Sequence, residues 1–81
     1  MDTKQKYVRI GRDEFIIFPM FMNHDAFYNF HPTSAGFCYI YGNKVDCYGE
    51  SVSLKLKSLP EDSMLATKQI FGYEAALNMD K

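Results

Sequence analysis

The sequence predicts an α+β domain in which an antiparallel sheet packs against a C-terminal helix, with the elements in the order ββ-α-βββ-α. Two observations lead to this fold class. Runs of alternating apolar and polar residues are separated by Gly-X pairs, and glycine takes the positive φ that two-residue hairpin turns require. A capping-box pattern then precedes a helical stretch near the C-terminus. With 81 residues the chain has room for one domain, 1–81.

The N-terminal part is expected to form two strands, 6–10 and 14–18. A two-residue turn at Gly11-Arg12 would place Arg9 opposite Glu14 and Val8 opposite Phe15. Asp13 could instead lengthen the loop and shift this register. Pro19 ends the second strand because it has no N–H to donate to a neighbouring strand.

The segment 36–57 is predicted to be a three-stranded meander with turns at Gly42-Asn43 and Gly49-Glu50. The first turn would place Ile40 opposite Val45 and Cys38 opposite Cys47. The second would place Cys47 opposite Val52 and Val45 opposite Leu54. One face of the meander is then an apolar core face, made of Cys38, Ile40, Val45, Cys47, Val52, Leu54 and Leu56.

The opposite face of the meander collects aromatic and charged side chains together, and a solvated face seldom holds so many rings. Its candidate interface residues are Phe37, Tyr39, Tyr41, Lys44, Asp46 and Tyr48. Three interpretations stay open for this face. The chain's own hairpin 7–18 or helix 23–30 could cover it, a second copy or another protein could bind it, or single-stranded nucleic acid could stack on it.

Two helical regions are expected outside the strands. A short helix, 23–30, begins at Asn23 and stops before Pro32, which cannot continue a helix. A longer helix is predicted from the pair Ser58 and Glu61, which matches a capping box with Ser58 as the N-cap. It would end near Phe71 and present a core-facing side made of Met64, Leu65, Lys68 and Phe71.

Gly72 is expected to end that helix as a left-handed residue, because glycine meets no Cβ penalty there. The segment 73–79 has helical propensity and is expected to form a second, shorter helix at an angle to the first.

The composition is that of an ordinary folded protein, with 47% hydrophobic and 23% charged residues. Seven Phe and six Tyr give 16% aromatic residues, so some rings are expected near the surface of so small a domain. The formal charge of −1 gives no general attraction to nucleic acid or anionic lipid. Because no apolar run resembles a signal peptide or a membrane span, we expect a cytoplasmic protein that does not bind membranes.

The two cysteines are predicted to face each other at a non-hydrogen-bonded pair, where Cα atoms lie ~4.5 Å apart. A disulfide is permitted but strained at that separation. Because cysteines of cytosolic proteins are mostly reduced, we favour two buried thiols over a bridge.

No pattern of reactive residues indicates an enzyme, a metal site or a cofactor. His24 and His31, with the two cysteines, have spacings that match none of the usual zinc patterns. The segment 49–53 resembles a nucleophile elbow without its last glycine, but that motif needs a much larger hydrolase sheet. His24 next to Asp25 is expected to lie on the surface in the first turn of the short helix.

These observations predict a small non-enzymatic protein that acts by macromolecular binding or self-association, with a homodimer or another protein as its partner. The alternative is a single-stranded nucleic-acid-binding protein that uses the aromatic face of the sheet.

Overall fold

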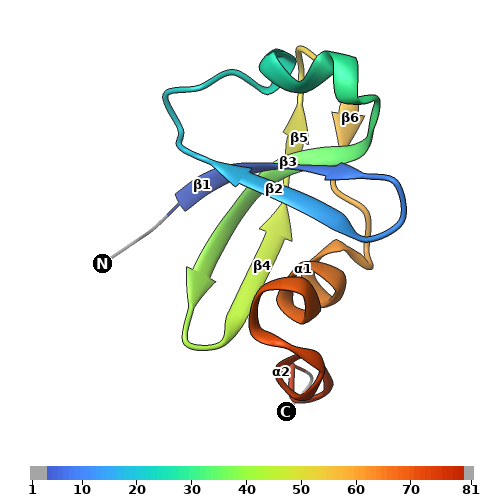
Figure 1. Cartoon of the computed structure of the whole chain (residues 1–81). Helices are drawn as coiled ribbons and strands as arrows, with labels where there is room; N and C mark the ends of the chain where they lie inside the picture. Colours follow the sequence, from blue (N-terminus) through green and yellow to red (C-terminus); the bar gives the residue numbers. More distant parts are fainter. Residues whose placement is uncertain (1–3, 80–81) are drawn as a thin grey trace.

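The computed structural model describes residues 4–79 and confirms the predicted α+β class (Figure 1). Four strands form an antiparallel sheet in the order β2-β1-β3-β4. They are β1 (Lys4–Ile10), β2 (Glu14–Phe18), β3 (Pro32–Tyr41) and β4 (Lys44–Tyr48). The other elements are the 3₁₀ helix η1 (His24–Phe30), the short strands β5 (Glu50–Ser51) and β6 (Leu56–Lys57), and the helices α1 (Asp62–Phe71) and α2 (Tyr73–Leu77).

The predicted register of the first meander hairpin is confirmed. β3 and β4 pair with Cys38 opposite Cys47 and Ile40 opposite Val45. Gly42 begins the connecting turn with a φ of 55°. Because a one-residue slip would exchange the two faces of a strand, this register fixes which side chains enter the core beneath α1.

The predicted third strand of the meander is wrong. After Tyr48 the chain leaves the four-stranded sheet, and β5 pairs with β6 as a separate two-stranded sheet. Val52, expected in the core opposite Cys47, is 82% exposed. Leu54 and Leu56 pack on the other side of the sheet, in a cluster with Val8, Phe18 and Ala35.

Helix α1 explains why no third strand pairs with β4. The N–H of Val45 donates to Thr67 Oγ1 at 2.9 Å, and the N–H of Cys47 donates to Ser63 Oγ at 2.8 Å. Each hydroxyl also donates to the carbonyl of the same strand residue, at 3.2 and 3.4 Å respectively. The outer edge of β4 therefore has its backbone groups bound by a helix, which leaves them unavailable to another strand.

The N-terminal hairpin differs from its expected two-residue register by one residue. Val8 lies opposite Ile16 and Arg9 opposite Phe15, because Asp13 lengthens the turn to three residues. Arg9 supports the longer turn, since its Nε donates to the carbonyl of Arg12 at 2.7 Å.

Helix α1 begins at Asp62 rather than after Ser58, so the predicted capping box is wrong. The Asp62 carboxylate instead accepts a hydrogen bond from the N–H of Leu59 at 3.0 Å. The helix ends at Phe71 as expected and α2 follows it, but Gly72 has φ 102° and ψ 172°, which is not the left-handed conformation.

The buried side of α1 also differs from the expected one. Met64 is 49% exposed, and the fully buried positions are Asp62, Ala66 and Thr67. Two of these three are polar because the helix is held to the sheet by hydrogen bonds as well as by apolar contacts.

The sheet has a different cover on each side (Figure 1). On the α1 side, the buried core consists of Tyr7, Phe15, Cys38, Val45 and Ala66. On the other side, η1 and the β5–β6 segment cover only a second cluster, which is built on Val8, Phe18 and Ala35 with Met22, Phe27, Leu54 and Leu56 packed against it.

Candidate interaction surface

The six predicted interface residues lie together on the side of the sheet away from α1. Strand pairing places Phe37 opposite Tyr48, Tyr39 opposite Asp46 and Tyr41 opposite Lys44. Paired residues of neighbouring strands project from the same face. We call this set, Phe37, Tyr39, Tyr41, Lys44, Asp46 and Tyr48, the aromatic face.

Three of the four rings of the aromatic face form a row of direct contacts. The rings of Tyr39 and Tyr48 stack with centroids 5.6 Å apart and an interplanar angle of 13°. Phe37 lies 6.0 Å from Tyr48, and 5.6 Å from His24 in an edge-to-face arrangement. His24 in turn makes an edge contact with Phe18 at 5.5 Å. The row therefore joins half-buried Tyr39 to the buried cluster under η1.

The chain itself covers part of the aromatic face. Phe37, Tyr39 and Tyr48 are half-buried, whereas Tyr41 at the tip of the β3–β4 hairpin is 54% exposed. Gly49 permits one close approach, since a Cβ there would lie 3.0 Å from the Phe37 ring. The end of the face near Phe37 is thus packed from within, and the end near Tyr41 is open.

A few charged side chains lie beside the rings. The Lys4 ammonium lies 4.8 Å from the centroid of the Phe37 ring, a cation–π contact. Burial, and then the neighbouring Tyr39 hydroxyl, raise the pKa of Tyr48 to about 12. The Tyr48 hydroxyl is therefore neutral at physiological pH and remains a hydrogen-bond donor.

His24 is buried, at 5% exposure, so its expected position on the surface is wrong. Its Nε2 lies 2.8 Å from the carbonyl oxygen of Gly36, which requires a proton on Nε2. Burial, and to a lesser extent the nearby Lys6 ammonium, lower the pKa of His24. The imidazole packs between the rings of Phe18 and Phe37 and so extends the aromatic row into the core.

Both cysteines are free thiols that face each other across β3 and β4. Burial raises the pKa of Cys38 to about 11 and also raises that of Cys47. Thiols are nucleophiles and metal ligands as thiolates, so neither cysteine is activated at neutral pH. Within residues 4–79, no three His, Cys, Asp or Glu side chains are grouped so that they could hold a metal ion.

A buried polar cluster around Asp62 escaped prediction from the sequence. The Asp62 carboxylate, fully buried, accepts hydrogen bonds from the Tyr7 hydroxyl at 2.5 Å and the Ser34 hydroxyl at 2.7 Å, and pairs with Arg9 Nη1 at 3.0 Å. Burial lowers the pKa of Arg9, but hydrogen bonds to Glu61 and Asp62 outweigh this and raise it. Burial and then the bond to Asp62 raise the pKa of Tyr7.

The Asp62 cluster is a fixed structural element rather than a reactive site. Every buried side-chain nitrogen and oxygen in the described part of the chain has a hydrogen-bond partner. No sequence signal could have found the cluster, because Tyr7 and Asp62 are 55 residues apart and belong to different elements.

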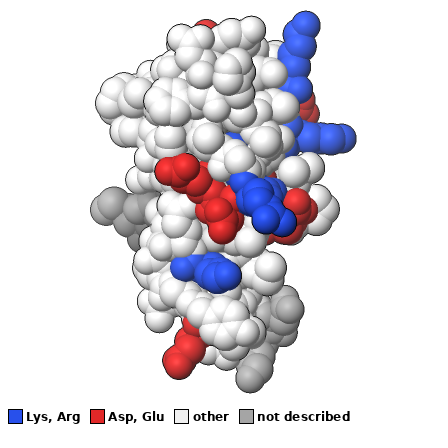
Figure 2. All heavy atoms as spheres, turned by 45° about the vertical axis from the view of Figure 1, so that its right-hand side comes forward, with Lys and Arg blue, Asp and Glu red and all other residues white. Residues whose placement is uncertain are grey.

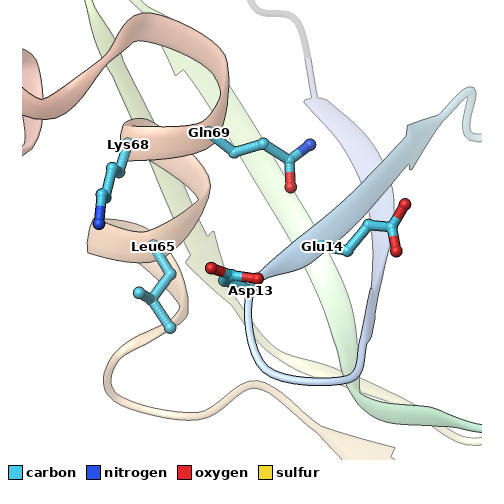
Figure 3. A pocket seen from close by; sticks show the side chains of 5 residues that line it. All are labelled: Asp13, Glu14, Leu65, Lys68 and Gln69. Atoms are coloured by element: carbon cyan, nitrogen blue, oxygen red, sulfur yellow. The ribbon is translucent and has the colours of Figure 1, made fainter.

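One open cleft lies away from the aromatic face, between the start of β2 and helix α1 (Figure 3). Its volume is about 480 Å³, and its lining residues are Asp13, Glu14, Leu65, Lys68 and Gln69. The lining contains none of the predicted site residues.

Comparison with protein-family models, curated proteins and solved structures finds no match for this chain. Among residues 4–79, no helix has the length and apolar character needed to cross a membrane.

Proposed function

We propose that this chain is a non-enzymatic cytoplasmic protein that acts by binding another protein molecule through the aromatic face, and that the first partner is a second copy of the chain. The observation that carries this proposal is the ring row from buried His24 through Phe37 and Tyr48 to Tyr39, with the exposed ring of Tyr41 further along the same face. Tyrosine-rich surfaces with few charges are typical of the central part of protein interfaces.

Pre-organisation favours binding by this surface. Tyr39 and Tyr48 hold each other in place, so little side-chain entropy is left to lose when a partner covers them. Tyrosine is also among the residues that contribute most to interface affinity. The open end at Tyr41 offers an exposed ring whose hydroxyl can bind at a partner's polar rim.

The area available predicts a weak dimer. An aromatic side chain buries about 150–250 Å² when fully covered, and three of the four rings are already half-buried. The face therefore supplies less than the ~800 Å² per partner of a standard interface. We expect association in the micromolar range that depends on protein concentration.

Sedimentation equilibrium of the wild type and of Tyr41→Glu tests the proposal. The new charge should weaken association at least about tenfold, because it would be buried without a partner. Tyr73→Glu is the matched control, since Tyr73 is 63% exposed on α2, outside the aromatic face. A wild type that stays monomeric at high micromolar concentration, or equal effects of the two variants, would refute self-association through this face.

Single-stranded nucleic acid is the second candidate partner, supported by the contact of Lys4 with Phe37 and by Lys44 on the same face. Rings beside ammonium groups can stack bases and bind phosphates. The side of the molecule that Figure 2 shows offers less support. In the view of Figure 2, acidic and basic side chains are interspersed across the middle of the molecule without a large basic area.

A fluorescent oligothymidine titration distinguishes the two candidates. Binding that falls steeply as salt rises, and that is lost in a Lys4→Gln, Lys44→Gln variant, would favour nucleic acid. Self-association that is insensitive to the same double change would favour the protein partner.

A further inference from the structure

The two edges of the four-stranded sheet are closed to different extents by α1. On β4, the residues whose backbone groups point outward are Val45 and Cys47, and both are bound by helix hydroxyls. On β2, one outward residue, Phe15, is bound by Gln69 from the same helix. The next outward residue along β2 is Ile17, because residues of an antiparallel strand direct their backbone groups to alternate sides.

Gln69 binds Phe15 as a neighbouring strand would. The Phe15 N–H donates to Gln69 Oε1 at 2.6 Å, and Gln69 Nε2 donates to the Phe15 carbonyl at 3.0 Å. These are the two bonds of a hydrogen-bonded residue pair in an antiparallel ladder. The side-chain amide therefore takes the place of the N–H and C=O of one residue of an absent fifth strand.

The edge continues unoccupied beyond Phe15. Ile17 directs its backbone groups to the same side of β2 as Phe15, and within residues 4–79 no hydrogen bond from outside the sheet reaches its N–H or C=O. Between Glu14 and Pro19, the β2 segment carries no residue that usually protects an edge. The run Phe15-Ile16-Ile17-Phe18 contains no lysine, no proline and no bulge.

A cleft lies beside the Phe15 end of this edge, and its lining combines one apolar residue, two acidic residues, Lys68 and Gln69. Its ~480 Å³ lies in the range of ligand-binding clefts. In Figure 3, Gln69 and Asp13 point into the space between α1 and β2, Leu65 lies on the helix side, and Glu14 points to the far side of β2.

We propose that the outer edge of β2 is a strand-addition site for an extended peptide segment of a partner protein, and that Gln69 holds the edge until the peptide displaces it. The segment would alternate apolar and basic side chains. Successive side chains of a strand point to opposite faces, so the apolar ones would contact Leu65 on the helix side while the basic ones lie beside Glu14 on the other.

A second copy of the chain fits this edge less well. Paired in antiparallel fashion about a two-fold axis, β2 would present only the apolar run 15–18 and Pro19 to its twin. The segment 15–19 of a second copy contains no lysine or arginine that could pair with Asp13 or Glu14 in the cleft. If the axis passed through Ile17, Pro19 would lie opposite Phe15 without an N–H to donate. This proposal concerns a different surface from the aromatic face and does not depend on it.

NMR titration of the isotope-labelled full chain with a blocked hexapeptide, Thr-Val-Lys-Val-Lys-Thr, tests the proposal. We expect the amide signals of residues 15–18 to shift on binding, and the Ile17 amide to become protected from hydrogen exchange. The same peptide with glutamate in place of lysine should bind at least about threefold more weakly, because like charges would then lie opposite Glu14.

Two N-methylated peptides provide the matched control. Methylation of every second amide removes the donors on one edge of the peptide, either the edge that faces β2 or the edge that faces solvent. One peptide should therefore lose binding while the other keeps it. Equal behaviour of the two would overturn strand addition.

Gln69→Ala should bind the wild-type peptide about fivefold or more tightly, since the peptide no longer has to displace the two hydrogen bonds of the carboxamide. No shift at residues 15–18 in either the wild type or this variant at millimolar peptide would overturn the proposal. Shifts at residues 15–18 that depend on protein concentration without peptide would show that a second copy, rather than a peptide, takes the edge.

Discussion

On the α1 face of the sheet, a buried carboxylate binds three elements together, whereas on the opposite face the rings of Phe37, Tyr39 and Tyr48 pack against one another and end in open surface. The α1 face is specified by hydrogen bonds with fixed partners, at Asp62 and along the edge of β4. The aromatic face is held by ring contacts, and its end at Tyr41 is exposed. We infer that stability resides mainly in the α1 face and that the other face is free to serve binding.

Asp62→Ala should lower the free energy of unfolding more than any other change to either face. Removing the carboxylate leaves the buried Arg9 with only the half-exposed Glu61 as an ionic partner, and it leaves the hydroxyls of Tyr7 and Ser34 without an acceptor. Breaking a buried ion pair in this way costs about 3–5 kcal/mol, which approaches the whole stability of a small domain, ~5 kcal/mol. Circular dichroism should show a largely unfolded chain, and Asp62→Asn should give a measurable, lower urea midpoint.

Glu61→Ala is the control for that experiment. Glu61 also pairs with Arg9, at 3.1 Å, but its side chain is 47% exposed. Exposed ion pairs contribute only about 0–1 kcal/mol. A change of similar size in the two variants would show that the buried cluster does not anchor the α1 face.

A smaller loss is expected for Thr67→Val, which removes the hydroxyl while keeping the shape of the side chain. The N–H and C=O of Val45 would lose their partner at a buried position, at a cost of about 1–3 kcal/mol. Hydrogen exchange should become faster at Val45, while Cys47, bound by Ser63, serves as an internal reference. Unchanged exchange at Val45 would mean that the helix does not close the edge of β4.

The pH dependence of stability tests whether His24 supports the aromatic row as a neutral ring. Its pKa is lowered in the folded protein from an unfolded value of about 6.5. The unfolded chain therefore binds the proton more readily, and stability should fall as pH drops below ~6.5. Each unit of lowering corresponds to about 1.4 kcal/mol.

Urea midpoints measured between pH 7.5 and pH 5 check this prediction, because most carboxylates titrate below that range. His24→Gln should flatten the dependence, and His31→Gln, at an exposed position, should leave it unchanged. A profile that is the same in all three proteins would assign the pH dependence to other groups.

The contrast between the faces also explains what the sequence could predict. The alternation of Cys38, Ile40, Val45 and Cys47 around Gly42 determined the β3–β4 register, because both the turn and the burial pattern are local signals. The third strand could not be excluded from its own pattern. It is displaced by a helix whose Ser63 and Thr67 hydroxyls bind the same edge, and this competition depends on tertiary contacts.

The same limit applies to the two proposed binding surfaces. The aromatic face could be assembled from strand pairing alone, since its members alternate along two neighbouring strands. Its contact with His24, and the pairing of Gln69 with Phe15, join residues far apart in the sequence. No periodicity indicates such contacts, so they became visible only in the folded chain.

The smallest predicted effect is the coupling between Tyr39 and Tyr48, and it sharpens the inference that the aromatic face is pre-organised. A double-mutant cycle with Tyr39→Leu and Tyr48→Leu should give a coupling energy of about 0.5–1.5 kcal/mol, the range for aromatic pairs in direct contact. A cycle that combines Tyr39→Leu with Tyr28→Leu is the control, because Tyr28 is exposed on η1 and the two changes should be additive within about 0.5 kcal/mol.

The four proteins of the Tyr39 and Tyr48 cycle can also be measured by sedimentation equilibrium. If a partner binds the stacked pair, each variant that breaks the stack should associate more weakly than the wild type. Coupling indistinguishable from the control would mean that the two rings move independently, and the proposed dimer would then have to bear the full entropic cost of ordering them.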